Sequence, residues 1–183
     1  DMSETRIAVK TLGAEGGSFV VDDPAVWARP MAECGMNCRV TRPLSGQVEV
    51  LPQEDGCLAR GRLTGEIVVP CDRCAEDAVV VSDHRFESFE PFPSVTREGE
   101  TEHDGETDEL VIHVTENGDM EFDLGGLLWE EFALCVPFKP LCRPDCRGVC
   151  PVCGQNRNEG DCDCAEERGD PRLAALRGLR VEK

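Results

Sequence analysis

The sequence contains no tyrosine, few other aromatic residues and only three histidines among its 183 residues. The histidines, His84, His103 and His113, all lie apart from the densest run of cysteines. A catalytic zinc site needs an open coordination position and usually histidine or carboxylate ligands, so this pattern argues against one. No glycine-rich phosphate loop and no Ser/His/Asp arrangement stands out. We therefore expect a protein that is not an enzyme and has no small-molecule substrate.

Long apolar runs are also missing. No stretch approaches the roughly 20 apolar residues that a membrane-spanning helix needs. No charged segment followed by an apolar one opens the chain, as a secretory signal would. Asp1 precedes Met2, and we take Met2 as the natural start. From these absences we expect no membrane association and a cytoplasmic protein.

Basic residues are scarce compared with acidic ones: 19 against 37, for a formal charge of −18. The imbalance lies in residues 1–138, which hold 29 acidic and ten basic residues, whereas residues 139–183 hold eight and nine. Such a charge repels phosphate backbones and favours basic partners. We therefore expect a basic protein partner, and at most a weak or indirect contact with RNA through the arginines of residues 139–183.

Part of this acidity falls in residues 94–109, where almost nothing is apolar. We expect a solvated, flexible loop there, in preference to a docking element for a basic partner. The acidic residues of this run are Glu98, Glu100, Glu102, Asp104, Glu106, Asp108 and Glu109.

Alternating apolar and polar residues predict β-strands through much of the chain. From Ser45 onward, including Leu58–Val69 and Ala78–Phe86, the alternation predicts an antiparallel meander. Shorter strands are expected around Ile7 and at Phe19–Val21. Two more strands, Leu110–Val114 and Met120–Phe122, flank Asn117-Gly118, a strong hairpin turn.

Helices are predicted at three places. Pro24 follows two aspartates and predicts a short helix over residues 24–33. The main helix begins after Asp123, a plausible cap, and ends before Pro137. Its apolar face, which should pack on the sheet, consists of Leu124, Leu127, Leu128, Phe132 and Cys135. A short terminal helix is expected from Asp170-Pro171.

Together these elements predict an α+β fold: an antiparallel sheet packed by one main helix, with a C-terminal cysteine-rich segment that binds zinc. Residues 1–138 would form an acidic body, and residues 139–183 a zinc-binding tail that ends in the short helix.

The tail carries the most specific motif of the sequence. Cys150-Pro-Val-Cys153-Gly154 can present two thiolates to one ion from a tight turn, because Gly154 permits the positive φ that closes it. Cys162 and Cys164, one residue apart, would project to the same side of an extended segment. Four thiolates in a tetrahedral shell suit zinc or iron, and we favour zinc as the commoner structural ion.

A second site is also conceivable, because Cys142 and Cys146 remain in the tail and Cys71-Asp-Arg-Cys74 ends a predicted strand far upstream. These four cysteines could hold a second ion and clamp the tail onto the sheet. The alternative is a single zinc site with four ligands drawn from the six C-terminal cysteines. The spacing leaves both alternatives open. Cys57 and Cys135 are expected to be ordinary strand and helix residues.

The pair Cys71 and Cys74 also allows a rival function, that of a zinc-dependent thiol redox or transcription regulator. Dithiol oxidoreductases place the first thiol at a helix N-terminus after a strand. Here a strand is followed by another strand, so the redox interpretation is the weaker one.

Several of these segments together resemble the YceD family, the large ribosomal RNA subunit accumulation proteins of bacteria and plastids. The resemblance spans roughly residues 45–180, and its most specific part is the C-terminal cysteine run. The segments that carry it are Gly65–Cys74, Asp119–Leu124 with the following helix, Pro140–Gly154 and Asp170–Leu176.

This resemblance implies a cytoplasmic, non-enzymatic factor that supports processing or accumulation of large-subunit ribosomal RNA. It implies no catalytic residues. Some family members lack most of the C-terminal cysteines, so that cluster would be a stabilising device, and Cys71, Arg73 and Cys74 would be the better functional candidates. The acidic body would then bind a basic ribosomal protein or an rRNA-processing factor.

Overall fold

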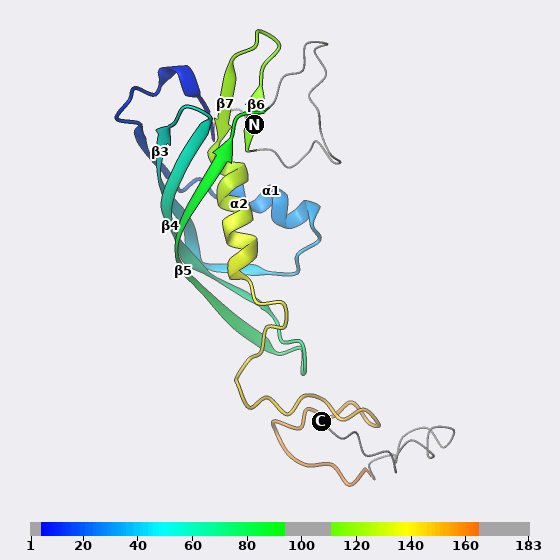
Figure 1. Cartoon of the computed structure of the whole chain (residues 1–183). Coiled ribbons are helices and arrows are strands. Elements are labelled where there is room, and N and C mark those ends of the chain that lie inside the picture. Colours follow the sequence, from blue (N-terminus) through cyan, green and yellow to red (C-terminus); the bar gives the residue numbers. More distant parts are fainter. Residues whose placement is uncertain (1–4, 94–110, 165–183) are drawn as a thin grey trace, which may run out of the picture.

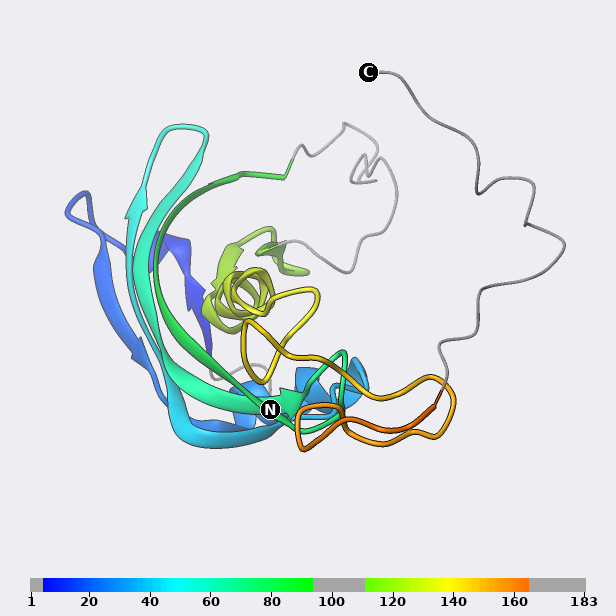
Figure 2. The same ribbon diagram turned by 90° about the horizontal axis from the view of Figure 1, so that it is seen from below.

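The computed structural model describes residues 5–93 and 111–164. The acidic run at 94–109 and the helix expected from Asp170 lie outside these described residues. The main feature is a four-stranded antiparallel sheet that curves around the longer helix, α2 (Figures 1 and 2). Its order is β2-β3-β4-β5, with β2 at Gly17–Val21, β3 at Arg39–Pro52, β4 at Gly56–Pro70 and β5 at Asp77–Pro91.

The three long strands are the predicted meander, and their alternation positions the core. On β5, Ala78 and Val80 are buried while Val79 and Val81 are each 58% exposed, so one face of the strand meets the core and the other meets solvent. β3 begins at Arg39, six residues before the predicted start at Ser45. The prediction missed this part because register shifts between Val40 and Ser45 disrupt the period of two.

Helix α2 (Leu124–Cys135) lies on the inner face of the curved sheet (Figure 2). Leu127, Leu128 and Phe132 are at most 1% exposed, and burial of each such side chain contributes about 1.5–3 kcal/mol. The sheet approaches so closely that a Cβ on Gly46 would lie 2.4 Å from Leu128 Cδ2. The helix begins as predicted, because the Asp123 carboxylate accepts a hydrogen bond from the Gly126 N–H at 3.0 Å.

A second, three-stranded sheet has the order β1-β7-β6, with β1 at Arg6–Ala8, β7 at Met120–Asp123 and β6 at Ile112–Val114. Asp123 joins this sheet to α2. Besides capping the helix, its carboxylate accepts from the Thr5 hydroxyl at 3.2 Å and lies 3.5 Å from Arg6 Nε.

The shorter helix, α1 (Pro24–Glu33), packs beside α2. Its Trp27 ring meets the Phe132 ring edge to face, with centroids 6.0 Å apart. As the sequence predicted, Pro24 opens the helix. The structure adds that the Asp23 carboxylate caps it, accepting from the Ala25 N–H at 2.9 Å. The predicted α+β class with an antiparallel sheet is therefore confirmed. The domain boundary near residue 138 stays a prediction.

Candidate metal centres

Eight of the twelve cysteines lie in two groups of four that could each hold a metal ion. Within each group all four sulfur atoms lie within 4.8 Å of one another. We call Cys71, Cys74, Cys142 and Cys146 centre A, and Cys150, Cys153, Cys162 and Cys164 centre B. In Figure 1 the segment that follows α2 lies beyond the turn between β4 and β5.

Centre A joins two parts of the chain that are far apart in sequence. Cys71 and Cys74 lie in the turn between β4 and β5, and Cys142 and Cys146 follow α2. The Sγ atoms of Cys71 and Cys146 are 3.7 Å apart, and those of Cys74 and Cys142 are 3.5 Å apart. A disulfide would need about 2.05 Å. Four thiolates about 2.3 Å from a central zinc would lie about 3.8 Å apart, so the observed spacing fits a tetrahedral S4 site.

The Cys-x-x-Cys turns of the two centres share one backbone pattern. In centre A, the Ala75 N–H donates to the Cys71 carbonyl at 2.9 Å, and the Cys71 N–H donates to Glu76 O at 2.7 Å. In centre B, the Gly154 N–H donates to the Cys150 carbonyl and the Cys150 N–H donates to Gln155 O, both at 2.8 Å.

The residue after the second cysteine has a positive φ in both turns, 61° at Ala75 and 76° at Gly154. Only the second of these was predictable, since the sequence has glycine there and alanine at the first.

Polar N–H groups point at the sulfur atoms and favour thiolates. Burial would raise the pKa of Cys71, but hydrogen bonds from the backbone around it outweigh burial and lower its pKa to about 6. One of these donors is the Arg73 N–H, 3.5 Å from the sulfur. Backbone hydrogen bonds from Cys153 and Val152 likewise lower the pKa of Cys150 to about 6. One thiolate in each turn, that of Cys71 and that of Cys150, is therefore available near neutral pH.

The two centres differ in exposure to solvent. In centre A, Cys71, Cys74 and Cys146 are buried and Cys142 is half-buried. In centre B only Cys150 is buried, while Cys153 is exposed. Solvent, oxidants and chelators therefore reach centre B more easily.

Backbone contacts fasten the tail to the β4–β5 turn around centre A. The Asp72 N–H donates to Pro140 O at 2.8 Å, and the Val149 N–H donates to Arg73 O at 3.1 Å. The Arg73 guanidinium donates to Cys146 O at 2.7 Å. Gly148, with a φ of 71°, passes so close that a Cβ there would lie 3.0 Å from Arg73 O.

One contact links the centres directly. Asn158, in the centre B loop between Cys153 and Cys162, donates from Nδ2 to Cys146 Sγ of centre A at 3.4 Å. Its Oδ1 accepts from the Arg147 N–H at 2.8 Å. Sequence reasoning did not single out Asn158, because an asparagine between two cysteine pairs has no distinctive spacing.

The structure brings together the same two sets of four cysteines that the sequence suggested. The structure therefore has two sets of four possible ligands. The alternative from the sequence was a single set drawn from the six C-terminal cysteines. Cys34 and Cys38 belong to neither set. Cys38 Sγ instead lies 3.6 Å from Met31 Sδ. Cys57 is a buried residue of β4, and Cys135 is the last residue of α2.

Within the described residues, neither helix has the length and apolar character needed to cross a membrane. No solved structure matches the chain. Among curated proteins, uncharacterized proteins of Mycobacterium bovis and Mycobacterium tuberculosis are 30% identical over 100 residues. The match covers 55% of this chain but 44% of each relative, so the chain spans less than half of their length.

The family model described as large ribosomal RNA subunit accumulation protein YceD matches residues 59–180. The match contains most of the β4–β5 hairpin, all of α2 and all eight cysteines of the two centres. Since it covers more than half of the sequence, the chain belongs to the YceD family.

Proposed function

We propose that the chain is a non-enzymatic, zinc-stapled factor that supports the accumulation or processing of large-subunit ribosomal RNA by binding a basic protein. That protein would be a ribosomal protein or an rRNA-processing factor, and the site of action would be the cytoplasm, where thiols stay reduced. The family membership carries the proposal. The formal charge of −18 supports a protein partner over bare RNA, because phosphate contacts dominate affinity for nucleic acid.

Zinc is the proposed ion in both centres. An all-thiolate, tetrahedral donor set suits zinc or iron, and zinc is the commoner structural ion. Structural zinc contributes on the order of 10–16 kcal/mol of apparent binding free energy, which is as large as the stability of a whole domain. The described part of the tail, residues 139–164, has few buried apolar residues of its own, so the metal would supply its stability. Centre A would then hold the tail and the sheet as one unit.

Capture of ribosomal proteins tests the function. Immobilised, zinc-loaded chain should retain proteins extracted from purified large ribosomal subunits at low salt and release them as salt is raised, because charge attraction is screened. In cells, loss of the protein should lower large-subunit rRNA relative to small-subunit rRNA. Retention of bare RNA with no ribosomal protein would overturn the proposal.

The rival function, a thiol redox or transcription regulator using Cys71 and Cys74, has less support. Both side chains are buried, at 4% and 7% exposure, and the residues after Cys74 form a strand in place of the helix that such dithiols need. Reversible release of metal from centre A under mild oxidation, with rRNA levels unchanged, would favour this rival.

A further inference from the structure

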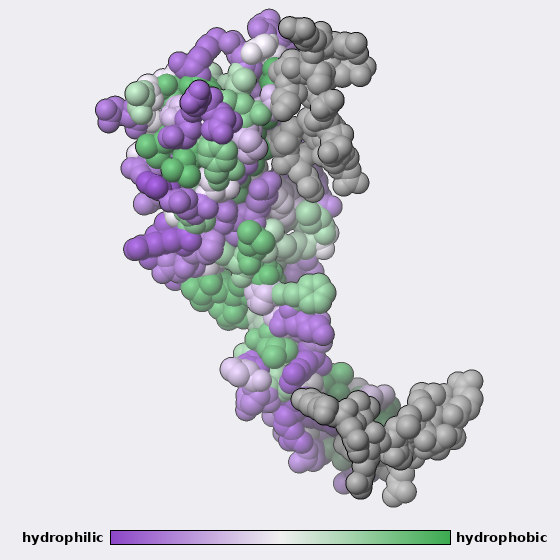
Figure 3. All heavy atoms as spheres, viewed as in Figure 1, coloured by the Kyte–Doolittle hydropathy of each residue, from purple (hydrophilic) through white to green (hydrophobic). Residues whose placement is uncertain are grey.

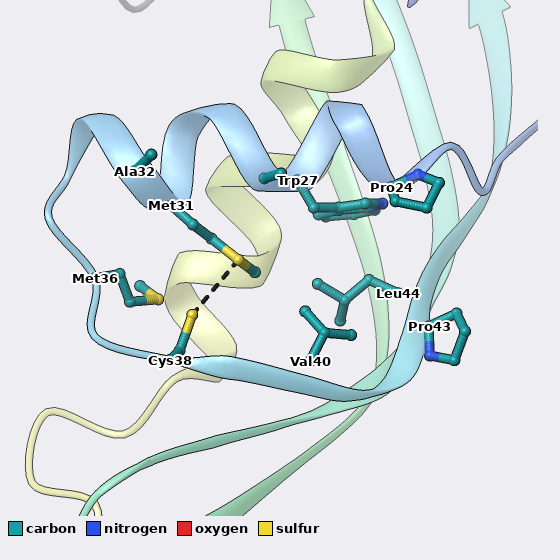
Figure 4. A pocket seen from close by; sticks show the side chains of 10 residues that line it. Pro24, Trp27, Met31, Ala32, Met36, Cys38, Val40, Pro43 and Leu44 are labelled. Carbon is teal, nitrogen blue, oxygen red and sulfur yellow. Dashed lines mark hydrogen bonds between the residues drawn. The ribbon is translucent and has the colours of Figure 1, made fainter.

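An apolar groove of about 420 Å³ lies between α1 and the first part of β3 (Figure 4). Its buried walls include Trp27, Met31 and Leu44. Val40 also lines the groove and is 47% exposed, so the groove is open to solvent on this side. Val40 pairs with the fully buried Ile67 of β4, so it lies on the core side of the sheet and faces α1.

All ten side chains that line the groove are apolar or cysteine. A small-molecule site normally adds a few convergent polar groups that orient the ligand. Here the only polar side-chain groups of the lining residues are the Trp27 indole N–H and the Cys38 thiol. Methionine side chains adapt to different apolar surfaces, and Met31 and Met36 both reach into the groove in Figure 4. The chemistry therefore fits a row of apolar side chains from another protein, as in the docking of an amphipathic helix.

Much of the visible face of the molecule is hydrophilic, with apolar residues in patches between the hydrophilic ones (Figure 3). Two cations of the elements that line the groove already have ion-pair partners, while Arg42 donates to Gly65 O at 3.0 Å. Arg29 pairs with Glu33 at 2.7 Å, and Arg39 pairs with Asp77 at 2.9 Å. Their charges are thus largely neutralised for an incoming partner.

The anions at the Pro24 end are not engaged in this way. Asp22 and Asp23 are exposed, and neither has an ion-pair partner among the described residues. Among the described residues, the Asp23 carboxylate accepts only the capping hydrogen bond from the Ala25 N–H. This end of the groove is therefore locally acidic and complements a lysine or arginine.

The same end carries an unsatisfied donor. Trp27 is 2% exposed, and its indole nitrogen has no hydrogen-bond partner in the part of the chain that the structure describes. In Figure 4 this nitrogen lies at the Pro24 end of the ring. A buried donor without an acceptor costs about 1–3 kcal/mol. This nitrogen is closed off from solvent, so an acceptor from a docked segment reaches it only if the Trp27 ring shifts.

We propose that this groove is the docking site for the basic partner: it accepts the apolar face of an amphipathic helix whose basic residues meet Asp22 and Asp23. The inference rests on the proposed function and adds to it the binding surface and the form of the bound segment.

The test compares two valines of the same sheet. Val40→Lys places a charge in the groove, whereas Val79→Lys changes a residue of 58% exposure on the opposite face. A ribosomal protein captured by the wild-type chain would be titrated against each variant in a Trp129→Phe background, which leaves Trp27 as the only tryptophan. We expect Val40→Lys to weaken binding about tenfold or more and Val79→Lys to leave it within about twofold.

Two further variants keep the test decisive. Val40→Gln makes the groove wall polar without adding a charge. It replaces Val40→Lys in the test if that variant loses the helical circular dichroism signal or the metal content of the wild type. Asp22→Asn with Asp23→Asn removes both charges while asparagine still caps α1, and should reduce the salt dependence of binding.

If the Val40→Lys and Val79→Lys variants bound the ribosomal protein equally well, the groove would not be the docking site. The proposed function would be unaffected by that result. Phe138 lies just beyond α2 and is 95% exposed. Loss of binding in Phe138→Ser, with binding retained in Val40→Lys, would also show that the groove is not the docking site. A wild-type chain that retains no ribosomal protein, or only RNA, would overturn the proposed function itself.

Discussion

Asn158 of the centre B loop donates a hydrogen bond to the sulfur of Cys146 in centre A, at 3.4 Å. A group that hydrogen-bonds to a metal ligand from outside stabilises its thiolate and fixes its orientation. This donor to centre A is held by a loop that centre B closes. Folding of the loop around one ion should therefore strengthen binding of the other.

Asn158→Asp tests this coupling. Aspartate keeps the acceptor for the Arg147 N–H but replaces the N–H donor to Cys146 with a carboxylate. Loss of such an outer partner typically costs 10–100-fold in metal affinity, so centre A should release zinc to a chromophoric chelator about tenfold or more faster. Release rates equal to those of the wild type would show that the contact does not support centre A.

Metal stoichiometry separates two sites from one. With both centres loaded, elemental analysis should find two zinc ions per chain. In denaturant without chelator, only the four cysteines outside the centres should react with a thiol reagent as long as zinc stays bound; chelator should expose all twelve.

Cys74→Ser and Cys153→Ser should each remove one zinc, the first from centre A and the second from centre B. Cys57→Ser, at a buried cysteine outside both centres, is the matched control and should keep two. One zinc per wild-type chain would exclude the two-centre arrangement and confine the metal to a single set.

Stability should fall on mild acidification because of His113. Burial lowers its pKa below the usual 6.5, and the charge of Arg6 adds to this, although Asp123 and Glu121 oppose it. The unfolded chain therefore binds this proton at a higher pH than the folded chain. The free energy of unfolding should be unaffected above about pH 6.5 and decrease as the pH falls through and below that value.

In His113→Gln, the free energy of unfolding should depend less on pH in this range than it does in the wild type. The measurement is denaturant unfolding between about pH 5.5 and 7.5, taken as the difference between variant and wild type. The difference cancels the acid sensitivity of the thiolates, which both proteins share. A difference that does not change with pH would show that His113 does not contribute.

Gly46 should tolerate no side chain, because a Cβ there would lie 2.4 Å from Leu128. Gly46→Ala forces α2 away from the sheet, and overpacking of this kind costs about 1–3 kcal/mol of unfolding free energy. Gly13→Ala is the control, since nothing lies within 4 Å of its Cβ position. Equal midpoints of denaturant unfolding for the two variants would contradict the close contact between α2 and β3.

Local patterns predicted the parts of this fold that local physics determines. The period of two revealed the long strands, and Asp123 with Pro137 marked the two ends of α2. Cysteine spacing suggested both groups of four. In contrast, pairing of β1 with β7 joins Ile7 to Phe122, residues that no local pattern relates.

The groove escaped prediction for a different reason. Its lining residues read as ordinary core positions, and Arg39–Leu44 lacks the strand period because of its register shifts. Whether an apolar side chain faces the core or an open groove depends on how α1 packs against β3. Tertiary packing of this kind leaves no signal in a single sequence.

The matching turns of the two centres allow one further prediction, based on Ala75 and Gly154. Both have a positive φ, where an L side chain costs about 1–2 kcal/mol. Ala75→Gly removes that strain but makes the unfolded chain freer by about 0.4–1 kcal/mol, so it should stabilise centre A by about 0.5–1 kcal/mol. Gly154→Ala should destabilise centre B by about 1 kcal/mol through backbone strain alone, because nothing lies within 4 Å of the added Cβ.

Zinc competition with a graded chelator measures both effects. Each substitution should change the affinity of its own centre most, and the contact between Asn158 and Cys146 should pass only a smaller change to the other centre. Gly35→Ala is a matched control: its φ is 60° with open space around it, but it lies outside both centres and should alter neither affinity. If Ala75→Gly weakened zinc binding at centre A, the alanine side chain would have a packing role that outweighs the strain. The two turns would then be alike in hydrogen bonding but stabilised in different ways.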